Sequence, residues 1–317
     1  MAEKGVVLKS TGSWYVVQKD DLSVLECRMT GKFRLDGLPT TNPIAVGDQV
    51  LIIPDNEAGK GIIKEIFPRK NYVVRQSPRN KHEVHLLASN VDQAVVVITV
   101  VQPKLKQGFI DRFLLMTEPY NISTLIVFNK ADLYKEEDMK IYNNLQKMYE
   151  DIGYDCLLLS AETGQGMGIL ANKLKDRISL IGGQSGVGKS SLLNKLDPSN
   201  IRKTGNISDY SGKGQHTTTF AEMFPFSMGG YIIDTPGIKT LGFNYLSQEE
   251  VAHNFREFFE LSKKCRFGGK CLHRNEPDCA VKDGLEKTVV SELRYQNYLQ
   301  ILSEIDEQNY WERQKGY

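Results

Sequence analysis

Residues 183–190 read Gly183-Gln184-Ser185-Gly186-Val187-Gly188-Lys189-Ser190. The stretch matches the P-loop pattern, and it lies between an apolar expected strand, Ile178–Ile181, and an expected helix, Lys189–Leu196. Glycines let backbone N–H groups turn inward around phosphates, and the start of the helix adds partial positive charge. We therefore predict an α/β domain whose P-loop, together with the preceding Gly182, binds the phosphates of a nucleotide.

Further residues complete the phosphate end of the predicted site. The Lys189 ammonium would reach the β- and γ-phosphates as a catalytic group, and Ser190 would ligate Mg²⁺. Asp234-Thr235-Pro236-Gly237 follows the expected strand Tyr231–Ile233. Asp234 could thus hold Mg²⁺ through water, and the Gly237 N–H could sense the γ-phosphate. Alone, this tetrapeptide would more often be an ordinary turn, but the P-loop upstream reverses that preference.

The choice of base depends on Asn129-Lys130-Ala131-Asp132, because a P-loop does not distinguish ATP from GTP. This tetrapeptide follows the expected strand Leu125–Phe128 and resembles the guanine-recognition motif of GTPases. The Asp132 carboxylate can accept hydrogen bonds from N1–H and the 2-amino group of guanine. Adenine would leave Asp132 buried and unpaired. The alternative, a capping Asp at a strand-to-helix turn, is disfavoured by the companion motifs.

The other residues of the predicted base site have supporting roles. Asn129 would hold the loop and face the base edge, and the stem of Lys130 would lie over the ring. Ser160-Ala161, which ends the next expected strand, resembles the supporting loop whose backbone N–H meets the guanine O6. The sequence therefore predicts a GTP site.

The order of these motifs is unusual. Conventional GTPases carry the P-loop first, whereas here residues 129–132 and 160–161 precede it. We therefore predict a circularly permuted G domain, which can form the same pocket because permutation is tolerated where the original termini lie close together. The segment Asp234–Gly237 then leads directly into the C-terminal part of the chain.

The chain divides into three expected domains. At 317 residues, with 40% apolar and 25% charged residues, it is long enough for two or three cores. Residues 1–68 contain short strands that favour a small β-barrel, assigned as an OB-fold: Gly5–Lys9, Trp14–Gln18, Leu22–Met29, Asp48–Ile53 and Gly61–Phe67. A basic connector, Arg69 to Lys81, opens the G domain at residues 69–245, and residues 246–317 form a helical domain.

A cluster of metal-ligand residues lies in the third domain. Cys265, Cys271, His273 and Cys279 fall within fifteen residues and suit a closed tetrahedral Cys₃His zinc site. Four protein ligands leave no open position, which favours a structural ion over a catalytic one. The alternative is a set of buried cysteines near an exposed histidine.

Together these motifs resemble the circularly permuted, ribosome-small-subunit-dependent GTPase A family over essentially the whole chain. The resemblance implies a barrel, a permuted G domain and a zinc domain, and GTP hydrolysis on the small ribosomal subunit late in its assembly. The family has the same order of Cys, Cys, His and Cys. Its Gly-x-His-Thr-Thr-Thr switch is matched by residues 214–219, where Thr218 is the expected Mg²⁺ ligand.

The group that activates water is less clear from the sequence. Ile238 stands where Ras-type GTPases carry a glutamine, and because an apolar side chain cannot orient water, intrinsic hydrolysis should be slow. His216 is the nearest candidate for the catalytic group. A structural hydrogen bond within the switch is an equally favoured role for this histidine.

Charge alone does not predict RNA binding, since the net charge is only +1. Basic residues concentrate at the end of the barrel and around the Cys/His cluster: Lys60, Lys64, Arg69, Lys70, Arg75, Arg79 and Lys81, and Lys263, Lys264, Arg266, Lys270 and Arg274. Solvated faces are the favoured interpretation of both, so rRNA contact rests on the resemblance. Two other classes stay open: a nucleotide-gated scaffold for a protein partner, and a P-loop kinase, which is disfavoured because no acceptor-substrate motif is evident.

The remaining features concern compartment and partners. No apolar run approaches the roughly 18–20 residues of a spanning helix, and the residues from Met1 to Lys4 lack a signal-peptide core. The cysteine pattern suits a reducing compartment. We expect a cytoplasmic monomer without membrane contact, whose partners are GTP or GDP and the small ribosomal subunit with its rRNA.

Overall fold

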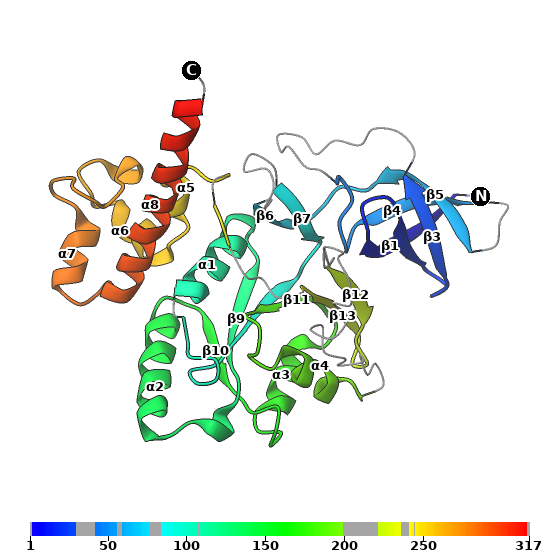
Figure 1. Cartoon of the computed structure of the whole chain (residues 1–317), viewed down its shortest axis with the longest axis horizontal. Coiled ribbons are helices and arrows are strands. Elements are labelled where there is room, and N and C mark those ends of the chain that lie inside the picture. The colour runs from blue at the N-terminus through cyan, green and yellow to red at the C-terminus, as the bar shows by residue number, and fades with distance from the viewer. Residues whose placement is uncertain are drawn as a thin grey trace.

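The computed structural model describes residues 2–29, 42–55, 59–76, 84–106, 108–198, 221–235, 241–243 and 245–315, with side chains as far as residue 307. Three parts are visible in Figure 1: an N-terminal barrel, a central sheet with helices on both faces, and a C-terminal group of helices. This arrangement confirms the predicted fold class. In the described residues, no helix is both long enough and apolar enough to cross a membrane.

The N-terminal part is a closed five-stranded barrel. Its strands follow the order β1-β2-β3-β5-β4, and β4 closes the ring by pairing with β1. Only β3 and β5 run parallel. The strands are β1 (Glu3–Ser10), β2 (Tyr15–Lys19), β3 (Val24–Met29), β4 (Gln49–Pro54) and β5 (Lys60–Ile66). Alternate side chains such as Val7, Val17 and Ile52 fill the interior, as the period of two in a strand requires. The predicted OB-type barrel is thus confirmed.

The central sheet has the order β10-β9-β8-β11-β13-β12. All neighbours run parallel except β12, which pairs antiparallel with β13. β12 also pairs with β1, so the central sheet continues into the barrel. The strands are β8 (Gln93–Ile98), β9 (Ser123–Phe128), β10 (Asp155–Leu158), β11 (Arg177–Gly183), β12 (Glu222–Pro225) and β13 (Gly230–Asp234). Every residue of β8 is buried, as expected for a strand covered on both faces.

Helices cover the two faces of this sheet. On one face, α1 (Gly108–Thr117) and α2 (Glu136–Asp151) pack on side chains such as Val96 and Ile126. On the other face, α3 (Met167–Leu174) and α4 (Lys189–Leu196) pack on Val95 and Val127. The expected strands at β9, β11 and β13 and the expected helix at α4 are confirmed, whereas α1 and α3 were not predicted.

The segment that the sequence suggested as a plain connector contains structure. Part of it forms a hairpin, in which β6 (Tyr72–Gln76) pairs antiparallel with β7 (Val84–Ser89). Arg69 is also fixed, because its Nε and Nη2 each lie 2.6 Å from the Asp48 carboxylate. The hairpin connects the barrel to β8. The predicted connector therefore joins the two parts, and the strand β6 within it was not predicted.

The C-terminal helices are α5 (Gln248–His253), α6 (Arg256–Ser262), α7 (Ala280–Glu286) and α8 (Glu292–Lys315). Short 3₁₀ turns lie at η1 (Glu118–Tyr120), η2 (Ala131–Leu133) and η4 (Gly268–Lys270). A capping box starts α5, where Ser247 and Glu250 satisfy each other's backbone N–H groups. Figure 1 shows this group beside α1, with α8 extending along it. Residues of α5, α6 and α8 join the same apolar core as α1 and α2.

Candidate functional site

The predicted nucleotide motifs meet at one edge of the central sheet. Asn129 follows the end of β9, Ser160 follows β10, Gly183 ends β11 and Asp234 ends β13. These strands are parallel, so their carboxyl ends lie together, which is where open α/β sheets bind ligands. The permuted order of the motifs therefore produces a common site.

The P-loop conformation depends on its glycines. Gly183, Gly186 and Gly188 have φ angles of 154°, 84° and 91°. A Cβ atom at Gly183 would lie 2.2 Å from the Val97 carbonyl oxygen, and one at Gly188 would lie 2.5 Å from Asn129 Nδ2. Larger residues at these two positions would therefore displace the loop from its neighbours.

Lys189 and Asp234 lie together below this loop. Lys189 Nζ donates to the Gly183 carbonyl over 2.8 Å and to the Gln184 carbonyl over 3.1 Å. Burial lowers the pKa of Lys189, while the nearby Asp234 carboxylate acts in the opposite direction. The buried Thr235 fixes this strand end, because its hydroxyl donates to the Ile181 carbonyl over 3.0 Å. Ser190 is exposed on the first turn of α4.

Asn129 connects the three loops of the base site. Its side chain is buried, and its Nδ2 donates to the Val187 carbonyl of the P-loop over 2.9 Å. Its Oδ1 accepts the Ala161 N–H over 3.1 Å. This supports the predicted loop-holding role. It also means that a guanine O6 would share the Ala161 donor with Asn129.

Lys130 and Asp132 lie on the loop that the sequence predicts to contact the base. Lys130 has a left-handed φ of 66°, and its Nζ donates to the carbonyls of Gln102 (2.6 Å) and Gly186 (2.8 Å). Asp132 is exposed and accepts a hydrogen bond from the Ser160 hydroxyl. The sequence argument assumed that an unmatched Asp132 would be buried. Here only a base lying over the carboxylate could desolvate it.

Sequence reasoning missed Tyr134, which also holds this loop. The Tyr134 hydroxyl donates to the Asn129 carbonyl over 3.0 Å and accepts the Val100 N–H over 2.9 Å. It therefore links the predicted base-recognition loop to the end of β8. An aromatic residue two positions after Asp132 was the only available signal, and such residues are common in cores.

Several predicted switch residues lie outside the described part of the chain. These are the candidate catalytic residue His216, the candidate Mg²⁺ ligand Thr218, and Gly237 with its neighbour Ile238. Their roles stay predictions from the sequence.

The cysteine and histidine cluster forms a compact buried group. The ligand atoms of Cys265, Cys271, His273 and Cys279 all lie within 4.8 Å of one another. Cys271 Sγ lies 3.8 Å from Cys279 Sγ, and His273 Nδ1 lies 3.4 Å from Cys279 Sγ. A tetrahedral zinc with Zn–S bonds of about 2.3 Å requires S–S edges of about 3.8 Å. The residues therefore fit a four-coordinate metal site.

Aromatic residues of α8 hold the ligand loop in place. The Tyr295 hydroxyl donates to the His273 carbonyl over 2.6 Å, and the Tyr298 hydroxyl donates to the Leu272 carbonyl over 2.8 Å. Burial lowers the pKa of His273 to about 4 and raises the pKa of Cys271 to about 12. A metal would thus meet a neutral imidazole but would have to displace the thiol proton.

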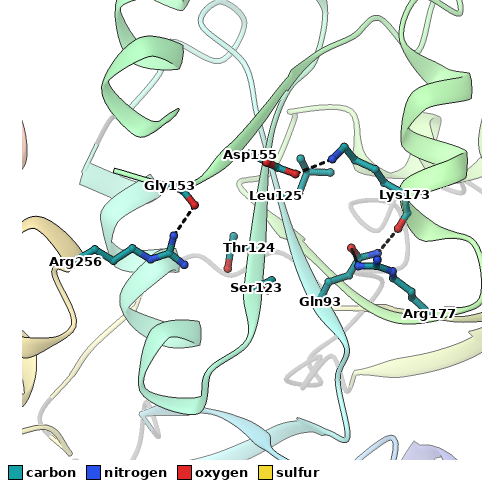
Figure 2. A pocket seen from close by; sticks show the side chains of 9 residues that line it. All are labelled: Gln93, Ser123, Thr124, Leu125, Gly153, Asp155, Lys173, Arg177 and Arg256. Atoms are coloured by element: carbon teal, nitrogen blue, oxygen red, sulfur yellow. Dashed lines mark hydrogen bonds and ion pairs between the residues drawn. The ribbon is translucent and has the colours of Figure 1, made fainter. Parts of the chain in front are cut away.

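A cavity of about 310 Å³ lies at the opposite, amino edge of the sheet. Figure 2 shows Gln93, Ser123, Asp155 and Arg177, the first residues of β8, β9, β10 and β11, around it. Its cations have partners, since Lys173 Nζ lies 2.7 Å from Asp155 and Arg256 donates to the Gly153 carbonyl over 2.6 Å. This cavity is separate from the nucleotide loops.

Comparisons with known proteins agree with this geometry. The family model described as RsgA GTPase matches residues 66–244, and the RsgA N-terminal domain matches residues 4–63. A protein of Phocaeicola vulgatus named small ribosomal subunit biogenesis GTPase RsgA is 47% identical over 97% of this chain and 98% of its own. A protein of the same name from Flavobacterium psychrophilum is 47% identical over 96% of this chain and 93% of its own.

Two solved structures are similar over almost the whole chain. The crystal structure of YjeQ from Thermotoga maritima has a TM-score of 0.74 and 35% identity, covering 96% of this chain and 99% of that one. The structure of YloQ, described as a circularly permuted GTPase, has a TM-score of 0.71 and 29% identity, covering 97% and 96%.

Proposed function

Because this chain belongs to the RsgA GTPase family, it is a GTP hydrolase, and we propose that it acts on the small ribosomal subunit late in the maturation of that particle. The main support for this proposal is the 47% identity, over 97% of the chain, to a relative named for small-subunit biogenesis. The meeting of all described nucleotide motifs at one sheet edge supports the same function.

The P-loop N–H groups and Lys189 would bind the phosphates, because the loop glycines leave its backbone open to a ligand. Mg²⁺ would come with GTP, held by Ser190, Thr218 and Asp234, and would neutralise charge that develops on the phosphates. The proximity of Lys189 and Asp234 supports this assignment. Gly237 would sense the γ-phosphate, as proposed from the sequence.

Guanine selectivity would come from Asp132, with Ala161 at O6 and the stem of Lys130 over the ring. Two hydrogen bonds support this arrangement, because Lys130 donates to the Gly186 carbonyl and Asn129 donates to the Val187 carbonyl. The base loop and the phosphate loop therefore have a fixed separation, which suits one rigid nucleotide.

The metal of the Cys₃His cluster would be a structural zinc. The three thiols and one imidazole are a donor set that zinc favours, and their separations match a tetrahedron. All four ligands are buried, so the ion would stabilise the C-terminal helices and have no open position for chemistry.

The surface of the zinc domain fits rRNA better than the end of the barrel does. Cations on both surfaces have carboxylate partners. At the barrel, Arg69 is bound to Asp48 and Lys70 pairs with Asp92 over 2.8 Å. At the zinc domain, Lys263 pairs with Glu260 over 2.6 Å and Arg266 with Asp278 over 3.5 Å. The zinc domain differs in the exposed rings beside its cations. On α6 and the loop after it, cations lie beside exposed rings. Lys263 Nζ is 5.3 Å from the centroid of Phe259, and the Arg266 guanidinium is 5.8 Å from that of Phe267.

These two rings are 44% and 49% exposed. Exposed aromatic faces can stack unpaired bases while adjacent cations contact phosphates. We therefore place the rRNA contact of the proposed function on this surface. The protein would work as a monomer in the cytoplasm, where small subunits mature.

The test is GTP turnover measured alone, with purified small ribosomal subunits and with large subunits as a specificity control. We expect acceleration by small subunits only, and none in a Lys189→Ala variant. Saturating binding to small subunits without acceleration would contradict the proposal. If that binding also required GTP, the result would favour a nucleotide-gated scaffold instead.

A further inference from the structure

Arg112, on the buried helix α1, contacts both the segment at Leu241 and the helix α8. Its Nη1 donates to the Leu241 carbonyl over 3.0 Å, and its Nη2 lies 2.5 Å from Glu304 Oε1 on α8. The Arg112 side chain is only 17% exposed. One planar guanidinium therefore holds both groups in a fixed geometry.

The first of these contacts holds the segment that leaves the γ-phosphate-sensing motif. Leu241 lies six positions after Thr235 and is buried, as is Phe243. A Cβ atom at Gly242 would lie 2.1 Å from Gln76 Oε1, so the segment passes tightly against β6. Residues 241–243 are thus clamped between α1 and the hairpin.

The second contact reaches a helix that is already fixed to α1. Asp111, the neighbour of Arg112, is buried and pairs with Arg294 at the start of α8. It also accepts a hydrogen bond from Asn297 over 2.5 Å. Glu304 lies ten residues beyond Arg294, which is about 15 Å along the helix. Asp111 thus anchors one end of α8, and Arg112 restrains it further along.

We propose that Arg112 is a positioning residue that couples the nucleotide switch to the zinc domain, through the Leu241 carbonyl on one side and Glu304 on the other. This inference rests on the proposed function, because the zinc domain is where the small subunit would bind. A shift of α8 on docking would act on Leu241 through Arg112, and a nucleotide-driven shift of Leu241 would act on α8. By linkage, the two effects must be equal in binding free energy.

Arg256 provides a matched control for the coupling. It also crosses between the zinc domain and the G domain, donating to the Gly153 carbonyl over 2.6 Å and to Glu118 over 2.8 Å. Figure 2 shows the contact of Arg256 with Gly153 beside the cavity at the amino edge of the sheet. Of the described contacts, none joins Arg256 to residues 241–243. Losing it weakens the domain contact without touching the proposed route.

The experiment compares Arg112→Gln, Glu304→Gln and Arg256→Gln in the full-length protein. It measures basal turnover, GTP and GDP affinity, and turnover on saturating small ribosomal subunits. Melting temperatures check folding. We expect Arg112→Gln to keep basal turnover and nucleotide affinity while losing at least five-fold in stimulated kcat. Its preference for small subunits in the GTP-analogue form over the GDP form should also fall. By linkage, the preference of subunit-bound protein for the GTP analogue over GDP should fall by the same factor as that binding preference.

Two comparisons separate coupling from simple loss of stability. Glu304→Gln should lose part of the stimulated kcat. The double variant with Arg112→Gln should lose little more than Arg112→Gln alone, because both residues act on one route. Arg112→Lys, which can hold only one partner well, should fall between wild type and Arg112→Gln. Equal stimulation of Arg112→Gln and Arg256→Gln would overturn the inference. If wild type itself were not stimulated, the proposed function would fail first.

Discussion

Asp132 is exposed and bound to the Ser160 hydroxyl, so the base discrimination proposed for it requires a base that covers the carboxylate. We expect Asp132→Asn to weaken GTP binding by about 10- to 100-fold, because hydrogen bonds to a charged group contribute roughly 1.5–3 kcal/mol. Nucleotide competition measures this loss. Unchanged GTP affinity with ATP still excluded would show that another group reads the base.

Xanthosine triphosphate is a sharp control for this variant. Xanthine carries a carbonyl where guanine carries its 2-amino group, and the Asn amide can donate to that oxygen. Asp132→Asn should therefore gain affinity for the xanthine nucleotide while losing affinity for GTP. A general collapse of the loop would weaken the binding of both.

His216 concerns the chemical step, and its role is still a prediction from the sequence. Without a glutamine after the Asp234–Gly237 motif, free protein should turn over at roughly 10⁻⁴ to 10⁻² s⁻¹, as unassisted GTPases do. His216→Ala should abolish most of the subunit-stimulated turnover and leave GTP affinity and subunit binding nearly unchanged. Single-turnover kinetics on small subunits check this. Full stimulation in the variant would assign His216 a structural role.

At the scale of elements, the sequence predicted the strands and helices whose own residues show the typical pattern, without reference to distant parts of the chain. The barrel strands are short runs between turn residues, and β9 contains the apolar run Leu125–Phe128, so both were recognisable. Helix α1 was missed because it carries Asp111 and Arg112 in an otherwise apolar stretch without a polar face. The partners of these two charges lie 183 and 192 residues away, where no local pattern can reveal them.

The candidate site was likewise predictable from local motifs but not from contacts between distant elements. Motif spacing predicted which loops meet, since each motif follows its own strand. It could not predict that Tyr134 fixes the Asn129 loop, or that Arg69 is used by Asp48 and is not free for RNA. Those outcomes depend on packing between elements.

The metal loop and α8 form the next element-scale test. Because Tyr295 and Tyr298 hold the loop against α8, loss of the metal should loosen both. Structural zinc contributes on the order of 10–16 kcal/mol of apparent binding energy in small modules. Cys271→Ser should lower bound zinc well below one per chain and speed proteolysis of the C-terminal helices. Elemental analysis and limited proteolysis measure the two effects.

Cys156→Ser is the matched control, because Cys156 is half-buried on β10 and lies outside the cluster. It should retain full zinc and wild-type proteolysis. Reduced wild-type protein that contains no zinc would remove the assignment altogether.

At the scale of the whole molecule, the G domain and the helical domain share one apolar core that includes residues of α1, α2, α6 and α8. A buried ion pair, Asp111 with Arg294, crosses this core, and Glu257 also binds Arg294. Removing one partner of such a pair costs about 3–5 kcal/mol. We expect Asp111→Asn to lower the free energy of unfolding by about 3 kcal/mol. Hydrogen exchange in α8 should then become about 100-fold faster.

Lys173→Gln is the comparison for that experiment. It breaks an ion pair with Asp155 whose side chains are 39% and 72% exposed, and such surface pairs contribute under about 1 kcal/mol. Its exchange in α8 should match wild type. Equal protection of α8 in the two variants would show that the Asp111–Arg294 pair does not hold α8 to the G domain.

The order of strands along the chain also determines when each strand can pair during synthesis. In the finished sheet β8 lies between β9 and β11, but β11 begins at Arg177, 79 residues after β8 ends at Ile98. At about 5–20 residues per second, a growing chain leaves one edge of this apolar strand unpaired for roughly 4–16 s. The loops proposed to read the base are thus made before the loop proposed to bind the phosphates. Such a newly made edge is open to wrong strand partners until the P-loop strand arrives.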